Sequence, residues 1–132
     1  MKDSEPHTIL IVDDEPDVLS YLGAFFEDHG LKVLTARDGK EGFEKARLFH
    51  PDLITLDISM PEESGVRMFR ELQEDSASVD IPVVIITGIS SDFKRFIETR
   101  KHVRPPAGYF EKPVEREQLL AKVKELLRLE AT

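Results

Sequence analysis

Five residues able to support metal and phosphoryl chemistry sit at the ends of short apolar segments: Asp13, Asp14, Asp57, Thr87 and Lys112. Clustered carboxylates repel one another unless a cation or protons neutralise them. A hard divalent cation such as Mg²⁺ prefers oxygen ligands and commonly binds one or two carboxylates together with water. A cation beside an aspartate and a lysine would create a positive cradle for a phosphoryl group, and a carboxylate nucleophile would form an acyl phosphate. The histidines show no metal-ligand spacing and cysteine is absent, which disfavours zinc.

The segments that must position these residues read as strands covered on both faces. They are rich in Val, Ile, Leu and Thr and alternate little in polarity. Four such strands are predicted, with a fifth, shorter one near the C-terminal end: Thr8–Val12, Val33–Ala36, Leu53–Leu56, Val83–Thr87 and Gly108–Phe110.

Helical periodicity separates these strands. The first helix has Pro16 in its first turn and stops near Gly30, and Asp38 with Glu41 has the spacing of a capping box that opens the second. The apolar positions that mark the other three helices are Val66, Phe69 and Leu72; Phe93, Phe96 and Ile97, capped by Ser90 or Ser91; and Leu119, Leu120, Val123, Leu126 and Leu127. Strands alternating with helices predict a parallel sheet with helices on both faces. Ligands bind such sheets at the carboxyl ends of the strands, where the five residues should therefore converge.

Composition narrows the function classes. The chain has 132 residues, a net charge of −8 and no cysteine, which indicates one domain, 1–132, with an ordered core at about 8–129. Disulfides are excluded, and a reducing, cytoplasmic location is expected. The negative charge argues against nucleic-acid binding. The apolar runs are too short to span a membrane, and no signal peptide is evident.

Four motifs occur in the order known from one family: IVDDE at 11–15, LDISMP at 56–61 followed by Gly65, IITG at 85–88 and EKP at 111–113. Together they resemble the receiver domain of bacterial two-component response regulators, over nearly the whole chain. The resemblance implies a flavodoxin-like (βα)5 doubly wound sandwich whose five parallel strands have the order 2-1-3-4-5.

The resemblance also implies the roles of the site residues. Asp57 would be the phosphoacceptor. Mg²⁺, with Mn²⁺ as an alternative, would be bound by Asp13, Asp14, Asp57 and the backbone carbonyl of Ser59. Lys112 and Thr87 would contact the phosphoryl group.

Further residues would respond to the phosphoryl group. Gly88 would leave room for it, and Thr87 and Tyr109 would form the conformational switch. The Lys112–Pro113 peptide bond would be cis. In isolation, Thr87 and Tyr109 would also be compatible with ordinary strand positions, where β-branched and aromatic residues are common.

The function implied is a phosphorylatable switch. It would receive its phosphoryl group from a sensor histidine kinase or a histidine phosphotransfer protein and act through contacts with a downstream protein. A homodimer that depends on phosphorylation is compatible with this role, and contact with nucleic acid or membrane is not expected. Beyond self-phosphorylation we expect no enzymatic activity except slow self-dephosphorylation, because Ser59 and Ile89 offer no carboxamide or carboxylate to hold an attacking water.

Three other interpretations remain open at this stage. The chain could be a receiver from a larger regulator or hybrid kinase. It could be a hydrolase resembling the haloacid dehalogenase family, although Ser59 stands where such enzymes have a second acid. It could also be a degenerate receiver that only binds partners. One departure from the family is a longer segment before the fifth strand, where Pro105 and Pro106 should end the fourth helix and place the usual output face in doubt.

Overall fold

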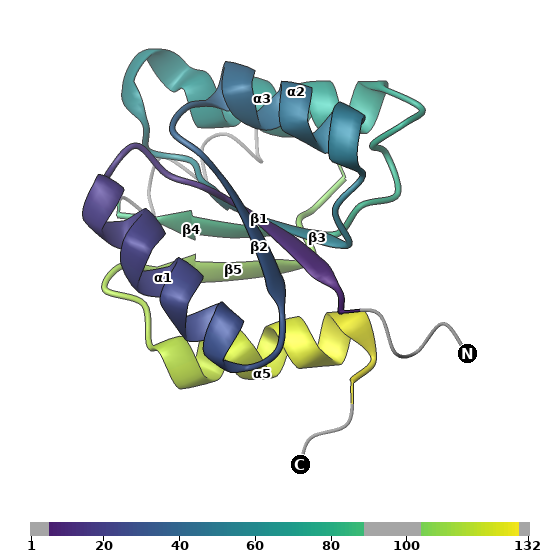
Figure 1. Cartoon of the computed structure of the whole chain (residues 1–132). Helices are drawn as coiled ribbons and strands as arrows, with labels where there is room; N and C mark the ends of the chain where they lie inside the picture. The colour runs from purple at the N-terminus through teal and green to yellow at the C-terminus, as the bar shows by residue number, and fades with distance from the viewer. Residues whose placement is uncertain (1–5, 89–103, 130–132) are drawn as a thin grey trace.

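The computed structural model describes residues 6–88 and 104–129, and these form one five-stranded parallel sheet (Figure 1). The strand order is β2-β1-β3-β4-β5, which confirms the flavodoxin-like order that the family resemblance implies. The strands are β1 (Thr8–Val12), β2 (Lys32–Ala36), β3 (Leu53–Asp57), β4 (Val83–Thr87) and β5 (Gly108–Glu111).

In the described parts of the chain, four α-helices pack on the two faces of the sheet. Figure 1 shows α1 and α5 on one face and α2 and α3 on the other. Their bounds, with a short 3-10 turn η2, are α1 (Pro16–Asp28), α2 (Gly39–Phe49), η2 (Pro61–Glu63), α3 (Ser64–Glu74) and α5 (Arg116–Leu127). The fourth helix expected around Phe93, Phe96 and Ile97, with its cap at Ser90 or Ser91, lies outside the described residues.

Alternate residues of each strand supply the two apolar layers. In β1, Ile9 and Ile11 join the cluster beneath α1 and α5, whereas Leu10 and Val12 join the cluster beneath α2 and α3. All four side chains are at most 1% exposed. Burial on both faces explains why the strand sequences show little alternation of polarity.

The start of α2 follows the capping pattern that the sequence indicates. The side chain of Asp38 accepts a hydrogen bond of 2.8 Å from the backbone N–H of Glu41. The Glu41 carboxylate reaches back to the backbone N–H of Arg37, at 2.9 Å. Two N–H groups at this helix end are therefore satisfied by side chains.

The predicted element boundaries differ from the observed ones by one or two residues. β2 begins at Lys32, β3 includes Asp57, and α3 begins at Ser64, two residues before the first apolar position, Val66, that marks this helix in the sequence. Helix α5 begins after Glu115, whose side chain makes no capping hydrogen bond.

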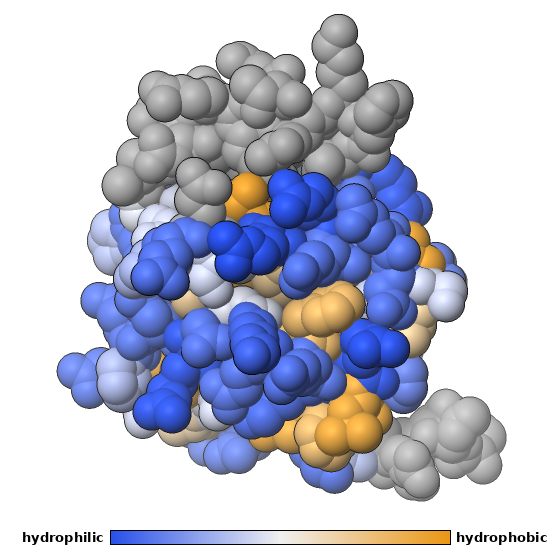
Figure 2. All heavy atoms as spheres, turned by 90° about the horizontal axis from the view of Figure 1, so that it is seen from above, coloured by the Kyte–Doolittle hydropathy of each residue, from blue (hydrophilic) through white to orange (hydrophobic). Residues whose placement is uncertain are grey.

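Most of the surface over α2 and α3 is hydrophilic, with a few apolar patches (Figure 2). Leu48 and Phe49, at the end of α2, are 71% and 52% exposed. Among the described residues, no helix has the length and apolar character needed to cross a bilayer.

Candidate functional site

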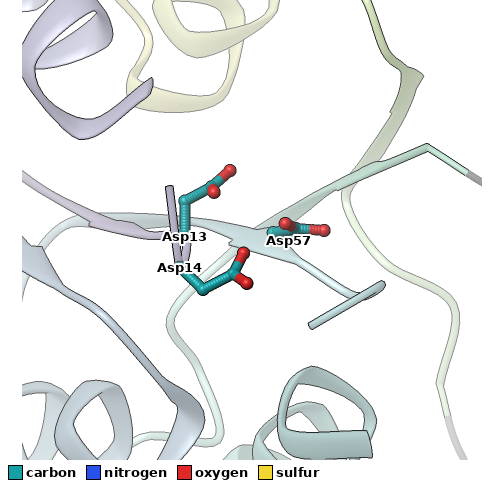
Figure 3. Close-up of side chains that lie close together, drawn as sticks. All are labelled: Asp13, Asp14 and Asp57. Carbon is teal, nitrogen blue, oxygen red and sulfur yellow. The ribbon is translucent and has the colours of Figure 1, made fainter. Parts of the chain in front are cut away.

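Three carboxylates meet at the carboxyl edge of the sheet. Asp13 and Asp14 directly follow β1, and Asp57 is the last residue of β3. Because β1 and β3 are parallel neighbours, their carboxyl ends lie side by side, and Figure 3 shows the three side chains gathered there. One oxygen of each carboxylate lies within 4.8 Å of the others. Asp13 and Asp57 are each 3% exposed, whereas Asp14 is exposed.

Lys112 brings a positive charge into this group of acids. Its ammonium nitrogen lies 3.2 Å from Oδ2 of Asp13, 3.2 Å from Oδ2 of Asp57 and 3.1 Å from Oε1 of Glu15. Burial disfavours the charged amine, but the negative charges of Asp57 and Asp13 and the hydrogen bond to Glu15 outweigh it and raise the Lys112 pKa well above its ordinary value. Lys112 is therefore a permanent cation at neutral pH.

The backbone of Lys112 is held against the end of β4. The Lys112 N–H donates a hydrogen bond of 2.9 Å to the carbonyl of Thr87, which continues the pairing of β5 with β4. The Lys112–Pro113 peptide bond is cis, the geometry that the family resemblance implies. The lysine is thus positioned by the sheet edge rather than by a long loop.

The two carboxylate oxygens of Asp57 have different partners. Oδ1 accepts hydrogen bonds from the backbone N–H of Ser59, at 2.9 Å, and from the Ser59 hydroxyl, at 2.7 Å. Oδ2 faces Lys112. The carboxylate is thereby fixed in orientation, as a nucleophile or a metal ligand must be.

Burial also affects the second buried acid. Desolvation raises the pKa of Asp13, and the nearby negative charge of Asp57 adds to this effect; the hydrogen bond from the Glu15 N–H and the charge of Lys112 oppose it. The rise in the Asp13 pKa is therefore chiefly the cost of burying a charged carboxylate, to which the negative charge of Asp57 adds. Three carboxylate oxygens within 4.8 Å of one another form a donor set that fits a divalent metal ion with oxygen ligands.

Thr87 lies on the strand next to that of Asp57, and Tyr109 lies one strand further across the sheet. Thr87 ends β4, adjacent to β3, and is fully buried. Tyr109 lies in β5, its ring packs against the cluster beneath α2 and α3, and its hydroxyl donates to Oε2 of Glu111 at 3.3 Å. A β-carbon added at Gly88 would meet no atom within 4 Å in the part of the chain that the structure describes. The structure therefore gathers Asp13, Asp14, Asp57 and Lys112 tightly, with Thr87 on the adjoining strand and Tyr109 further along β5.

A pocket of about 650 Å³ opens beside Asp14, between the N-terminal parts of α2 and α3. Its walls include Phe43 and Met60 and the basic side chains of Lys40 and Arg67. Of the three clustered acids, Asp14 alone lines this pocket.

Two contacts of the site were missed by the sequence analysis. Glu15 was interpreted only as part of the acidic motif, yet its carboxylate contacts Lys112. Ser59 was assigned only a backbone carbonyl, yet its hydroxyl bonds to Asp57. The spacing of Ser59, two residues after an aspartate, was a usable signal, because aspartate side chains commonly accept from the backbone two residues on.

Comparison with known proteins places these features in one family. A family model described as "Response regulator receiver domain" matches residues 9–124. The chain is 37% identical to Protein PilH of Pseudomonas aeruginosa, over 90% of this chain and 96% of PilH. It is 31% identical to the alkaline phosphatase synthesis transcriptional regulatory protein PhoP of Bacillus subtilis, over 91% of this chain but 48% of PhoP.

Comparison with solved structures gives the same family. The chemotaxis protein CheY4 of Vibrio cholerae superposes with a TM-score of 0.79 at 26% identity, covering 92% of this chain and 98% of CheY4. A CheY-like receiver domain protein of Methanospirillum hungatei gives a TM-score of 0.81 at 27% identity, over 93% and 94% of the two chains. The chain thus spans nearly all of some relatives but only about half of PhoP.

Proposed function

Because this chain belongs to the response regulator receiver domain family, we propose that Asp57 accepts a phosphoryl group and that the domain thereby switches its protein contacts. The observation that carries the proposal is the position of Lys112, 3.2 Å from Oδ2 of Asp57, beside an acidic cluster within 4.8 Å. A cation and a metal-binding set thus flank one oriented carboxylate, which is the arrangement that phosphoryl transfer requires.

The metal in this proposal is Mg²⁺, with Mn²⁺ as an alternative. Asp13, Asp14, Asp57 and the backbone carbonyl of Ser59 would hold it. When bound, the ion would neutralise charge on the phosphoryl oxygens. The support is the all-oxygen donor set of three carboxylates within 4.8 Å of one another, which favours a hard cation at this place.

The chain's own residues divide the remaining work. The Asp57 carboxylate attacks the phosphorus of a partner's phosphohistidine; a C–O–P linkage forms, the P–N bond breaks, and the imidazole leaves with the bonding electron pair. Lys112 neutralises an oxygen of the transferred group, and the Thr87 hydroxyl donates a hydrogen bond to it. Gly88 leaves space beside that group.

The switch would couple this event to the surface. In the proposal Thr87 moves toward the phosphoryl group and Tyr109, in the neighbouring strand, repacks inward. Tyr109 is half-buried, and its hydroxyl donates to the exposed Glu111. The ring can therefore become more buried when it repacks. The change is a shift between two populated arrangements, biased by the new negative charge.

We expect the phosphoryl group on Asp57 to persist. The domain is proposed to have no enzymatic activity beyond its own phosphorylation and slow self-dephosphorylation. The Ser59 side chain is a hydroxyl that donates to Oδ1 of Asp57, and it offers no carboxamide or carboxylate to hold an attacking water. Ile89, the other residue considered, lies outside the described residues. Decay of labelled phosphoprotein over minutes or longer is expected, and loss within seconds would contradict this.

Receiver domains of this family interact with histidine kinases. The proposed donor is accordingly a sensor histidine kinase or a histidine phosphotransfer protein, and the proposed output is contact with a downstream protein, with a phosphorylation-dependent homodimer as one form. The proposed location is the cytoplasm, where such donors present their phosphohistidine.

Incubation with acetyl phosphate and Mg²⁺, followed by intact mass measurement, tests the function. Wild type should gain one phosphoryl group, and Asp57→Asn should gain none. Asp17→Asn, which alters an exposed acid in the first turn of α1, is the matched control and should behave as wild type. Phosphorylation of Asp57→Asn would refute the assignment. Repeated turnover of phosphomonoesters would favour a hydrolase instead, and failure of wild type to bind beryllofluoride would favour a passive binding module.

A further inference from the structure

Among the described residues, Lys112 has one carboxylate partner that is not part of the cluster of three acids. Asp13 and Asp57 belong to the cluster of three acids, whereas Glu15, whose Oε1 lies 3.1 Å from the ammonium, does not. The side chains of Glu15 and Lys112 are 61% and 24% exposed, so this pair lies at the mouth of the site.

The backbone of Glu15 is held in place from both directions. Its N–H donates to Oδ1 of Asp13 at 2.9 Å, and its carbonyl accepts from the N–H groups of Val18 and Leu19 at 3.0 and 3.2 Å. Glu15 is the N-cap of α1, yet its side chain makes no capping hydrogen bond. The carboxylate is thus directed to Lys112 rather than to the helix that it precedes.

The three contacts of Lys112 differ in what phosphorylation does to them. A bound cation would neutralise Asp13 and Asp57 and weaken their hold on the ammonium. Glu15 has no such cation and keeps its full attraction for Lys112. An incoming phosphoryl group must therefore draw the ammonium away from Glu15 or share it with Glu15.

From this geometry we infer that Glu15 is a positioning residue that competes with the phosphoryl group for Lys112 and so lowers the affinity of the site for that group. The inference rests on the proposed function, because it concerns the same phosphoryl site. It assigns the third acid of the IVDDE motif a role in setting how readily the domain is phosphorylated, separate from metal binding.

Beryllofluoride binding in the presence of Mg²⁺, measured by calorimetry, tests the inference on the complete chain. Glu15→Gln should bind beryllofluoride about two- to fivefold more tightly than wild type, the range expected from losing one partly exposed ion pair. Structural damage would weaken binding, so a gain is diagnostic. Asp17→Asn removes an exposed acid two residues away that does not belong to the trio contacting Lys112, and should leave the affinity within twofold of wild type.

The outcomes separate this inference from the function on which it rests. Unchanged or weaker binding by Glu15→Gln overturns the competition. An equal gain in Glu15→Gln and Asp17→Asn also overturns it, because net charge would then explain both. If wild type itself fails to bind beryllofluoride or to become phosphorylated on Asp57, the proposed function fails and the inference falls with it.

Discussion

The backbone of Gly65, in the first turn of α3, packs directly against the backbone carbonyl of Asp57. A β-carbon at residue 65 would collide with that carbonyl oxygen and lie 2.8 Å from the α-carbon of Ile58. Both neighbours are backbone atoms of the segment that carries Asp57 and Ser59. The absence of a side chain at Gly65 therefore allows α3 to sit close enough to brace the candidate phosphoacceptor.

Gly65→Ala should destabilise the domain by about 1–3 kcal/mol, because the added methyl forces backbone to move in a packed region. Urea denaturation measures this change. Gly23→Ala is the matched control in another helix: there a β-carbon meets Val33 Cγ1 at an ordinary 3.6 Å, so the higher helix propensity of alanine should stabilise by about 0.5–1 kcal/mol. If Gly65→Ala is as stable as wild type, the close packing is wrong.

Thr55 presents a buried hydroxyl without a hydrogen-bond partner in the described part of the chain. It lies in β3, two residues before Asp57, and is 1% exposed. An unsatisfied buried polar group costs about 1–3 kcal/mol. Thr55→Val keeps the shape and removes the hydroxyl, so the free energy of unfolding should rise by about 1 kcal/mol or more.

Thr55→Ser is the companion variant for this measurement. It retains the hydroxyl but removes the methyl group from the core, and should therefore be less stable than wild type. Opposite signs for the two variants would identify the hydroxyl as the unfavourable group. Destabilisation by Thr55→Val would instead show that the hydroxyl is satisfied, for example by a buried water.

The stability of the domain should depend on pH through Glu41, at the start of α2. The hydrogen bond from the Arg37 N–H, helped by Lys45, lowers the Glu41 pKa below its ordinary 4.5. A lowered folded-state pKa contributes stability that is present above about pH 4.5 and lost as the pH falls through the lowered value. Glu41→Gln should be less stable than wild type at pH 7, and the difference should shrink below pH 4.5.

Urea denaturation from pH 7 to pH 3 checks this expectation. Glu44→Gln provides the comparison, since it removes an exposed acid from the same helix without touching the Arg37 hydrogen bond. A difference between wild type and Glu41→Gln that stays constant across this range would contradict the proposed origin of the stability.

The sheet and the acidic edge could be predicted from sequence because both depend on local pattern. Uninterrupted apolar runs, as in Ile9–Val12, indicate strands that are buried on both faces. Parallel pairing of such strands places their carboxyl ends at the same edge of the sheet. The strand pattern alone was therefore enough to predict that Asp13 and Asp57 lie at one edge of the sheet. The strand order itself came from the family resemblance, and the observed sheet confirms it.

The contacts that tune the site could not be predicted in the same way. The bond between Glu15 and Lys112 joins residues 97 positions apart, and it depends on side-chain directions that no local spacing specifies. The lack of space for a β-carbon at Gly65 likewise depends on how closely α3 approaches β3. The unpaired hydroxyl of Thr55 could not be predicted either, because threonine is common in strands and its hydrogen-bond partners depend on the folded neighbours.

Metal binding should stabilise the domain, and Asp14 should be needed for it. Asp13 and Asp57 are buried and bonded to neighbouring groups, whereas Asp14 is exposed beside the pocket and its carboxylate lies within 4.8 Å of theirs. Ligand linkage gives about 2.7 kcal/mol of stabilisation at a concentration of one hundred times Kd. Mg²⁺ should therefore raise the wild-type Tm progressively as its concentration increases.

Asp14→Asn separates this effect from general salt stabilisation. Without metal its Tm should equal or exceed that of wild type, since the substitution removes one charge from a group of mutually repelling carboxylates. With Mg²⁺ its Tm should rise much less, because one ligand charge is gone. Thermal unfolding of both proteins in MgCl2 and in NaCl of matched ionic strength measures the difference. Equal Mg²⁺-dependent shifts in the two proteins would mean that the ion binds elsewhere, and the three acids would then have to be explained without a metal.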